Sequence, residues 1–204
     1  MDNDNDGNPR LKIILVGEAG VGKTQLINVM NDLKFDEKYE ATLTTTSLVK
    51  QMDVGGTIIN VHFWDTMGEE KRRTNVDIFF KGSKIVIFVY SIIDRNSFKE
   101  IEDFWLGKIQ EKIGKDIILG LVGNKSDLYK DKEVENQEGI EYAAKIGAKW
   151  ILTSAKDDEK REEFKNYVFE LVKDYAKKVG IKINDKTITL LDKNISKQKG
   201  KKCC

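Results

Sequence analysis

Short hydrophobic runs alternate along the chain with longer segments of helical spacing. Leu11 to Val16 is an apolar, β-branched run of the kind that forms a buried parallel strand. In Gln25 to Leu33, which follows, leucine, isoleucine, valine and methionine recur at helical spacing. The same alternation predicts later strands at Lys84 to Tyr90, Ile117 to Val122 and Lys149 to Leu152, and helices at Lys71 to Phe80, Ser97 to Ile113, Gln137 to Ile146 and Glu159 to Val179.

One hairpin interrupts this alternation. Ser47 to Val54 and Thr57 to Trp64 alternate apolar and polar residues on either side of Gly55-Gly56, which is a strong hairpin signal. The lone His62 in the second strand is expected to be structural, because no metal-ligand spacing surrounds it. The whole pattern predicts an α/β fold, a mostly parallel six-stranded sheet with one antiparallel hairpin strand and helices on both faces. Ligands of such sheets bind at the carboxyl ends of the strands.

The loop between the first strand and the first helix has a phosphate-binding pattern. Its sequence is Gly17-Glu18-Ala19-Gly20-Val21-Gly22-Lys23-Thr24, which matches G-x-x-x-x-G-K-[ST]. The glycines let the backbone wrap a triphosphate, so that N–H groups from Glu18 to Gln25 and the positive end of the helix meet its negative charge. We expect Lys23 to reach the β- and γ-phosphates and the Thr24 hydroxyl to bind Mg²⁺. The competing interpretation is a glycine-rich turn that binds nothing, and the order of strand, loop, Lys-Thr pair and helix argues against it.

A second candidate lies after the hairpin, in Asp65-Thr66-Met67-Gly68. A carboxylate at Asp65 can hold Mg²⁺, partly through water, because Mg²⁺ keeps several waters and takes few protein oxygens. Gly68 lets its backbone N–H approach the γ-phosphate closely. Asp-x-x-Gly alone is a weak signal, and its place downstream of the phosphate loop makes it a strong one.

Two further segments predict recognition of guanine. The carboxylate of Asp127, in Asn124-Lys125-Ser126-Asp127, can accept hydrogen bonds from the N1–H and the exocyclic amine of guanine, a donor pair that adenine lacks. The Lys125 stem can lie over the ring, and the Asn124 amide can tie loops together. Ser154-Ala155-Lys156 ends the last strand and can place the Ala155 N–H against guanine O6. The alternative for both segments is an ordinary polar loop.

Composition limits the remaining possibilities. A chain of 204 residues with 40% hydrophobic and 34% charged residues fits one soluble domain with tails. Its 35 Lys and Arg nearly balance its 34 Asp and Glu, so no global field favours nucleic acid. No apolar run is long enough to span a bilayer, and no secretory signal is apparent. Both cysteines lie at the end of the chain, which excludes an internal disulfide and fits the cytosol.

The chain is expected to have three parts: a disordered acidic tail at 1–9, a domain at 10–180 and a flexible hypervariable tail at 181–204. Asp2, Asp4 and Asp6 imitate the start of an EF-hand loop. The last ligand position of such a loop would fall on Ile13, where a bidentate Glu is required, so calcium binding is not expected.

Taken together, these motifs resemble the Ras superfamily of small GTPases, which have a P-loop NTPase fold. The resemblance covers about Leu11 to Val179, and within the superfamily it is greatest to the Rab family. Rab-like features are Trp64 directly before Asp65, Phe88-Val89-Tyr90-Ser91, Ser97-Phe98, Trp105-Leu106, Gly123 to Leu128 and the Cys203-Cys204 ending.

The resemblance implies a GTP- and GDP-binding switch with slow GTP hydrolysis that acts in vesicle traffic. Phe35 would stack on the edge of guanine and Tyr39 would close over the phosphates. Thr42 would coordinate Mg²⁺ only while the γ-phosphate is present, and Gly68 would respond to the same phosphate. Implied partners are effectors, an exchange factor, a GTPase-activating protein, a prenylation escort protein and a GDP-dissociation inhibitor. A monomer is expected.

One catalytic position departs from the resemblance. Relatives usually have Gln where this chain has Glu69, after Asp65-Thr66-Met67-Gly68. The Gln orients the attacking water and can donate to the transition-state oxygens, whereas an ionised Glu accepts but cannot donate. Glu69 therefore joins Lys23 and Gly68 as a candidate catalytic residue whose effect on the rate stays open. The alternative function is a GTP-binding scaffold that scarcely hydrolyses, and a P-loop enzyme that uses ATP is disfavoured by Asn124 to Asp127.

The chain end resembles a lipidation site. Lys199-Gly200-Lys201-Lys202-Cys203-Cys204 is similar to Rab termini in which both cysteines receive geranylgeranyl groups. Two lipid chains assisted by lysines hold a protein firmly at an anionic membrane, whereas one chain holds it marginally. We therefore expect a pool on the cytoplasmic face of intracellular membranes and a cytosolic pool. The alternative is a basic tail with two exposed thiols.

Overall fold

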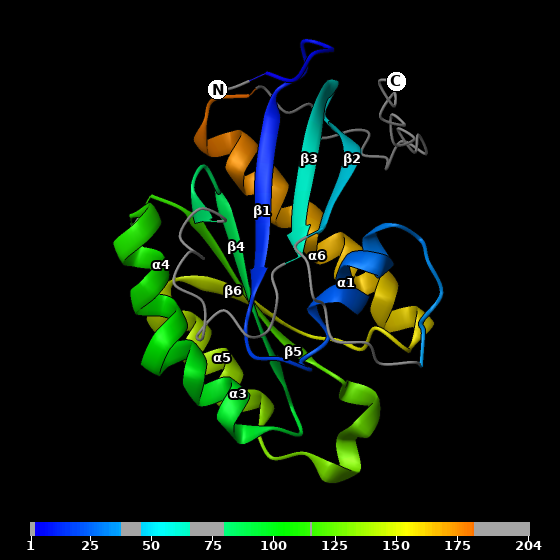
Figure 1. The fold of residues 1–204 in the computed structure, drawn as a ribbon, viewed down its shortest axis with the longest axis vertical. Coiled ribbons are helices and arrows are strands. Elements are labelled where there is room, and N and C mark those ends of the chain that lie inside the picture. The colour runs from blue at the N-terminus through cyan, green and yellow to red at the C-terminus, as the bar shows by residue number, and fades with distance from the viewer. Residues whose placement is uncertain (1–2, 38–45, 66–79, 115, 182–204) are drawn as a thin grey trace, which may run out of the picture.

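The computed structural model describes residues 3–37, 46–65, 80–114 and 116–181 of the chain (Figure 1). Its strands are β1 (Arg10–Val16), β2 (Thr46–Val54), β3 (Thr57–Asp65), β4 (Ile85–Ser91), β5 (Ile118–Asn124) and β6 (Ala148–Leu152). Its helices are α1 (Lys23–Met30), α3 (Arg95–Glu100), the π-helical η2 (Ile101–Trp105), α4 (Leu106–Ile113), the 3₁₀-helical η3 (Ser126–Asp131), α5 (Asn136–Ile146) and α6 (Asp158–Lys178).

The strands form one six-stranded sheet in the order β2-β3-β1-β4-β5-β6. Strand β2 pairs antiparallel with β3, and the other neighbouring pairs are parallel. The β2–β3 turn is made by Gly55 and Gly56, whose φ values of 64° and 91° lie in the left-handed region that glycine tolerates. The predicted α/β fold class is therefore confirmed.

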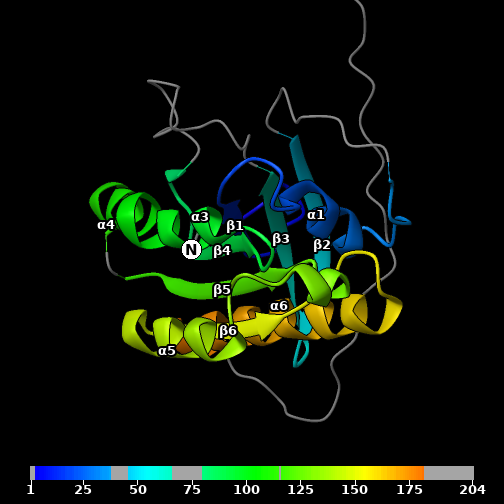
Figure 2. The same ribbon diagram turned by 90° about the horizontal axis from the view of Figure 1, so that it is seen from below.

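Two apolar cores lie on opposite faces of the sheet. Ile13 and Leu15 of β1 face a core that includes α1 and α6, while Ile14 and Val16 face a core that includes η2, α4 and α5. Because successive side chains of a strand point to opposite faces, a strand covered on both sides needs apolar residues at every position. Figure 2 shows α4 and α6 on opposite sides of β5. This double burial explains the continuous hydrophobic runs of the central strands.

The helix predicted over Ser97 to Ile113 is not a single α-helix. It begins earlier, at Arg95, because the Asp94 side chain accepts hydrogen bonds from the backbone N–H groups of Asn96 and Ser97. A π-helical turn, η2, then separates α3 from α4. This turn places Trp105 fully inside the core. The 3₁₀ turn η3, which starts after a left-handed Lys125 with φ 68°, was also not predicted.

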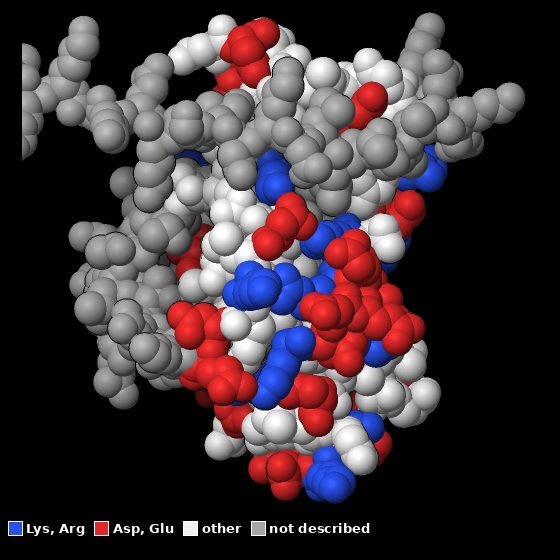
Figure 3. All heavy atoms as spheres, turned by 90° about the vertical axis from the view of Figure 1, so that its right-hand side faces the viewer, with Lys and Arg blue, Asp and Glu red and all other residues white. Residues whose placement is uncertain are grey.

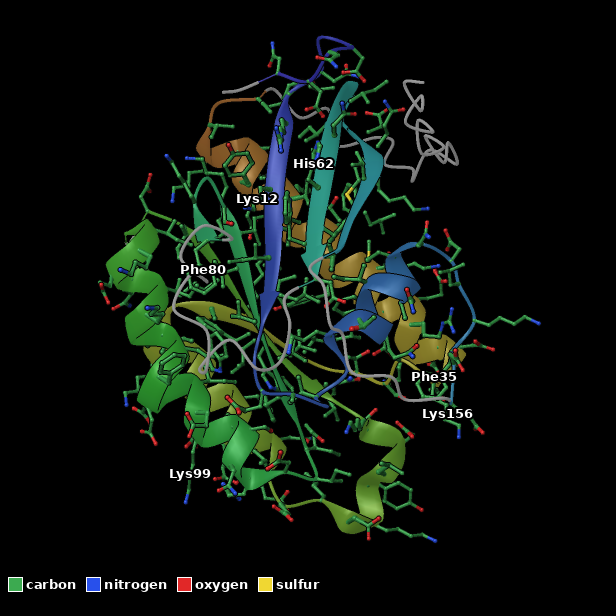
Figure 4. All side chains as sticks on the ribbon, in the orientation of Figure 1. Lys12, Phe35, His62, Phe80, Lys99 and Lys156 are labelled. Atoms are coloured by element: carbon green, nitrogen blue, oxygen red, sulfur yellow. The ribbon has the colours of Figure 1, made fainter. Side chains whose placement is uncertain are left out.

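Residues 3–9 differ from the disordered tail expected of the sequence. The structure places them in a tight turn in which Asn3 bridges Pro9. The turn lies on β3, where Asp4 Oδ2 is 2.7 Å from His62 Nε2 and Asp6 accepts from Asn60 Nδ2 at 3.0 Å. Asp4 and Asp6 therefore attach this polar segment to the sheet. His62, labelled in Figure 4, has the expected structural role.

Several predictions fall outside the described residues. Of the helix expected at Lys71 to Phe80, only Phe80 is described, and it is fully buried. Of the predicted tail at 181–204, only Ile181 is described, and it packs against the core on the α1 and α6 face. No helix among the described residues combines the length and the apolar character needed to cross a membrane.

Candidate nucleotide-binding site

The loop of residues 17–22 joins β1 to α1 at the carboxyl edge of the sheet. Two of its glycines are required by close packing. A Cβ on Gly17 would lie 2.1 Å from the backbone oxygen of Val89, and a Cβ on Gly22 would lie 2.4 Å from Asn124 Nδ2. Gly22 also has a φ of 98°, which side chains rarely adopt. The loop therefore approaches β4 and β5 more closely than any other residue type would allow.

Lys23 is held against the inside of this loop. Its Nζ donates hydrogen bonds to the backbone oxygens of Gly17 at 2.8 Å and Glu18 at 3.0 Å, and the residue is 5% exposed. Carbonyl oxygens stabilise a buried ammonium without neutralising its charge. The loop thus contains a fixed positive charge next to the N-terminus of α1, an arrangement suited to an anion.

Asp65 ends β3 beside α1 and is fully buried. Within the part of the chain that the structure describes, neither carboxylate oxygen makes a hydrogen bond of ordinary geometry. Burial raises the pKa of Asp65, and the neighbouring Thr24 hydroxyl and Lys23 ammonium oppose that rise. Among the described residues, the lone pairs of these carboxylate oxygens are not used in such hydrogen bonds and could coordinate a metal ion. A buried carboxylate beside a hydroxyl supplies the oxygen ligands that Mg²⁺ prefers. The predicted metal ligands Thr24 and Asp65 are thus brought together.

Asn124 connects the phosphate loop to the loop after β5. Its Nδ2 donates to the backbone oxygen of Val21 at 2.8 Å, and both residues are buried. The amide therefore joins two loops that are 103 positions apart in sequence, as expected of it. Lys125, the next residue, is half-buried, and burial lowers its pKa while Asp94 and Asp127 oppose that change.

The two segments predicted to contact guanine lie side by side. Ser154 Oγ donates to Asp127 Oδ1 at 2.6 Å and accepts from the backbone N–H of Lys156 at 3.1 Å. One hydroxyl thus fixes both the carboxylate and the turn that contains Ala155, which is 5% exposed. The two segments thus place a carboxylate acceptor next to the turn that contains the Ala155 backbone N–H.

Phe35 lies at the same end of the molecule, across from this edge. The Lys156 Nζ is 5.9 Å from the centroid of the Phe35 ring (Figure 4). The aromatic ring predicted to contact the base is therefore near the loop after β6. Of the remaining predicted site residues, Ala19 and Gly20 form the exposed tip of the phosphate loop. Tyr39, Thr42, Gly68, Glu69, Cys203 and Cys204 lie outside the described residues.

Two contacts of the site were not predicted from the sequence. Trp105 Nε1 donates to Glu18 Oε1 at 3.2 Å, so an indole from η2 contacts the phosphate loop. Gln25 Nε2 donates to the backbone oxygen of Asp36 at 3.1 Å. The sequence placed Trp105 only in a predicted helix and among the Rab-like features, with no role in the site. Neither contact has a local sequence signal, because each partner belongs to a different element.

Comparisons with known proteins agree with this geometry. The model of the Ras family matches residues 12–177. The human Ras-related protein Rab-21 is 38% identical over 152 residues, covering 74% of this chain and 67% of that protein. The Ras-related protein Rab-21 of Geodia cydonium is 35% identical over 170 residues, covering 83% of this chain and 71% of that protein. The Ras-related protein Rab-11B of Dictyostelium discoideum is 35% identical over 161 residues, covering 79% and 73%.

Proposed function

Since the chain belongs to the Ras family and is a Rab-like small GTPase, we propose that it is a magnesium-dependent GTP/GDP switch that regulates vesicle traffic on intracellular membranes. GTP hydrolysis, guanine-nucleotide binding and a dependence on regulators and effectors follow from the family. The observation that supports the proposal most directly is that four features lie together at one edge of the sheet: the phosphate loop, Asp65, the Asn124–Asp127 segment and the Ser154–Lys156 segment.

In this proposal, the described residues have separate roles toward the nucleotide. Lys23 and the N–H groups of the phosphate loop hold the phosphates, while Asp127 accepts hydrogen bonds from the guanine edge. Ser154 positions Asp127 through the 2.6 Å hydrogen bond between their side chains. Thr24 and Asp65 would hold Mg²⁺, which neutralises phosphate charge when bound. Asn124 fixes the position of the base-binding loop relative to the phosphate-binding loop.

Base selectivity tests this proposal. Purified protein is titrated with fluorescent GDP and ADP in Mg²⁺ and again in EDTA. We expect tight binding of GDP, weak binding of ADP and faster release of GDP without Mg²⁺. The Asp127→Ala variant should lose the preference for guanine, whereas Asp131→Ala, which removes an exposed carboxylate of η3, should keep it. Equal affinity for GDP and ADP in the wild type would refute the proposal.

A second candidate function follows from Glu69. An ionised carboxylate there cannot donate to the transition state and adds negative charge near an anionic phosphoryl group, which favours a GTP-binding scaffold with little hydrolysis. Single-turnover hydrolysis by the wild type and the Glu69→Gln variant, with and without an activating protein, distinguishes the two functions. Equal rates would show that this position does not limit hydrolysis.

We further propose that Cys203 and Cys204 are geranylgeranylated, which would place part of the protein on the cytoplasmic face of membranes. An exchange factor, an activating protein, a prenylation escort and a GDP-dissociation inhibitor would then be its partners. Mass spectrometry of the protein from its own cells tests the modification. An unmodified chain end would refute the lipid anchor without affecting the nucleotide switch.

A further inference from the structure

Residues 32–37, which we call the strap, lead away from α1 along the surface toward the proposed base site. Leu33, Lys34, Asp36 and Glu37 are exposed, and Phe35 is partly buried against the core on the α1 and α6 face. An exposed segment without regular structure is positioned only by its contacts with the body. In the strap, these contacts come from four separate elements.

The first contact is at the start of the strap. Asp32, which has a left-handed φ of 57°, binds Lys50 Nζ of β2 at 3.0 Å and Lys165 Nζ of α6 at 2.6 Å. The two lysine side chains are largely buried, at 6% and 11% exposure. Burial raises the pKa of Asp32, but the hydrogen bonds from Lys165 and Lys50 outweigh this effect and lower the pKa overall. Asp32 is therefore an ionised anchor that attaches the strap to β2 and α6.

The middle of the strap is held through its backbone. Arg161 of α6 donates from Nη2 to the backbone oxygen of Leu33. The Gln25 side chain makes two contacts with Asp36, donating to its backbone oxygen at 3.1 Å and accepting from its backbone N–H at 3.5 Å. Gln25 directly follows the proposed magnesium ligand Thr24 on α1. The strap is thus fixed to the first turn of the helix that borders the phosphates.

The end of the strap pairs with the loop after β6. Glu37 Oε1 is 3.0 Å from Lys156 Nζ, which also lies near the Phe35 ring. Lys156 belongs to the segment that Ser154 positions next to Asp127. The ion pair therefore connects the strap to the predicted guanine-binding edge. On the side of the molecule that Figure 3 shows, acidic and basic side chains lie next to one another.

From this arrangement we infer that the Glu37–Lys156 pair and the Gln25–Asp36 contacts form a latch that sets the rate of nucleotide release. The inference rests on the proposed function, because it needs a guanine base between Phe35 and the Ser154–Lys156 segment. A base leaving the site must pass between the strap and that segment, so the ion pair must separate first. Glu37 is then a positioning residue: it acts on the nucleotide through Lys156 and Phe35.

Both partners of the ion pair are exposed, with side-chain exposures of 75% for Glu37 and 55% for Lys156. Exposed pairs contribute little, so the Glu37→Gln variant should release fluorescent GDP about two- to fivefold faster than the wild type. Hydrolysis of already bound GTP should be unchanged, because Glu37 pairs with Lys156 at the predicted guanine-binding edge and so acts on the base. Glu111→Gln, which breaks an exposed pair with Lys112 on α4, is the matched control and should release GDP at the wild-type rate.

Salt dependence separates a latch from a general loss of stability. Raising the salt concentration from about 0.05 M to about 0.5 M screens exposed pairs, so it should accelerate GDP release from the wild type and change the Glu37→Gln variant less. The Glu37→Asp variant, which keeps the charge, should fall between the two. Failure of the wild type to bind GDP would overturn the proposed function together with the latch. Binding with equal release rates in the wild type and Glu37→Gln would overturn the latch alone.

Discussion

Replacing Asn124 with alanine tests how firmly the two halves of the site are joined. The side chain is 2% exposed, and its 2.8 Å hydrogen bond to the Val21 backbone oxygen links the loops after β5 and β1. The substitution leaves that buried oxygen without its donor, which costs about 1–3 kcal/mol of unfolding free energy. It also frees the Asp127 loop to move relative to the phosphate loop. Binding of GDP must then order that loop, and if this ordering also costs about 1–3 kcal/mol, the affinity for GDP falls by roughly 5- to 150-fold.

Two measurements and one control variant test the predicted effects of Asn124→Ala. Urea unfolding of the nucleotide-free protein gives the change in stability, and titration with fluorescent GDP and Mg²⁺ gives the change in affinity. Asn136→Ala removes an exposed amide at the start of α5 and should change stability by less than about 0.5 kcal/mol. If Asn124→Ala lost stability but bound GDP as the wild type does, the bond would be structural and the proposed coupling of the two loops would be wrong. An unchanged stability would refute the cost assigned to the buried oxygen.

Three further predictions concern other parts of the structure. A Cβ on Gly120 would lie 2.4 Å from the Tyr167 hydroxyl oxygen, so Gly120→Ala should lower the unfolding free energy by about 1–3 kcal/mol, and a wild-type urea midpoint would contradict this. The hydrogen bonds to Asp32 lower its pKa from 3.8, so its contribution to stability is full above that pH and is lost as the pH falls through the lowered value. The stability difference between the wild type and Asp32→Asn should therefore shrink between pH 6 and pH 3, and a difference that stayed constant would exclude the ion pairs as its source. Asp65→Asn should weaken the Mg²⁺ dependence of GDP release, and full retention of that dependence would remove Asp65 from the metal site.

Much of the fold could be predicted because its signals are local. The runs Leu11 to Val16 and Ile117 to Val122 are apolar at nearly every position, since helices cover both faces of the strands that they form. Gly55-Gly56 identifies the hairpin because glycine alone adopts both turn conformations easily. The loops at the carboxyl ends of the strands were found for the same reason: their residue types and spacing are set by the chemistry of phosphate and guanine.

The features that were not predicted depend on partners that are distant in sequence. Asp6 and its hydrogen-bond donor Asn60 are 54 positions apart, so the sequence of the first residues indicates only a polar tail. The contact between Glu18 and Trp105 spans 87 positions. The π-helical turn η2 adds a residue to one helical turn, a change that hydrophobic spacing does not resolve. Polar contacts of this kind depend on the tertiary structure. The periodic spacing of apolar residues along the chain contains no information about them.

The turn at residues 3–9 has a practical consequence for labelling. It is fixed to Asn60 and His62 of β3, which lie beside the start of β1, whereas the phosphate loop follows the end of β1. Seven residues of strand separate the two ends, a distance of about 23 Å. A fluorophore or affinity tag attached ahead of this turn would therefore be joined to a segment that hydrogen bonds hold in place. It would lie far from the proposed nucleotide site.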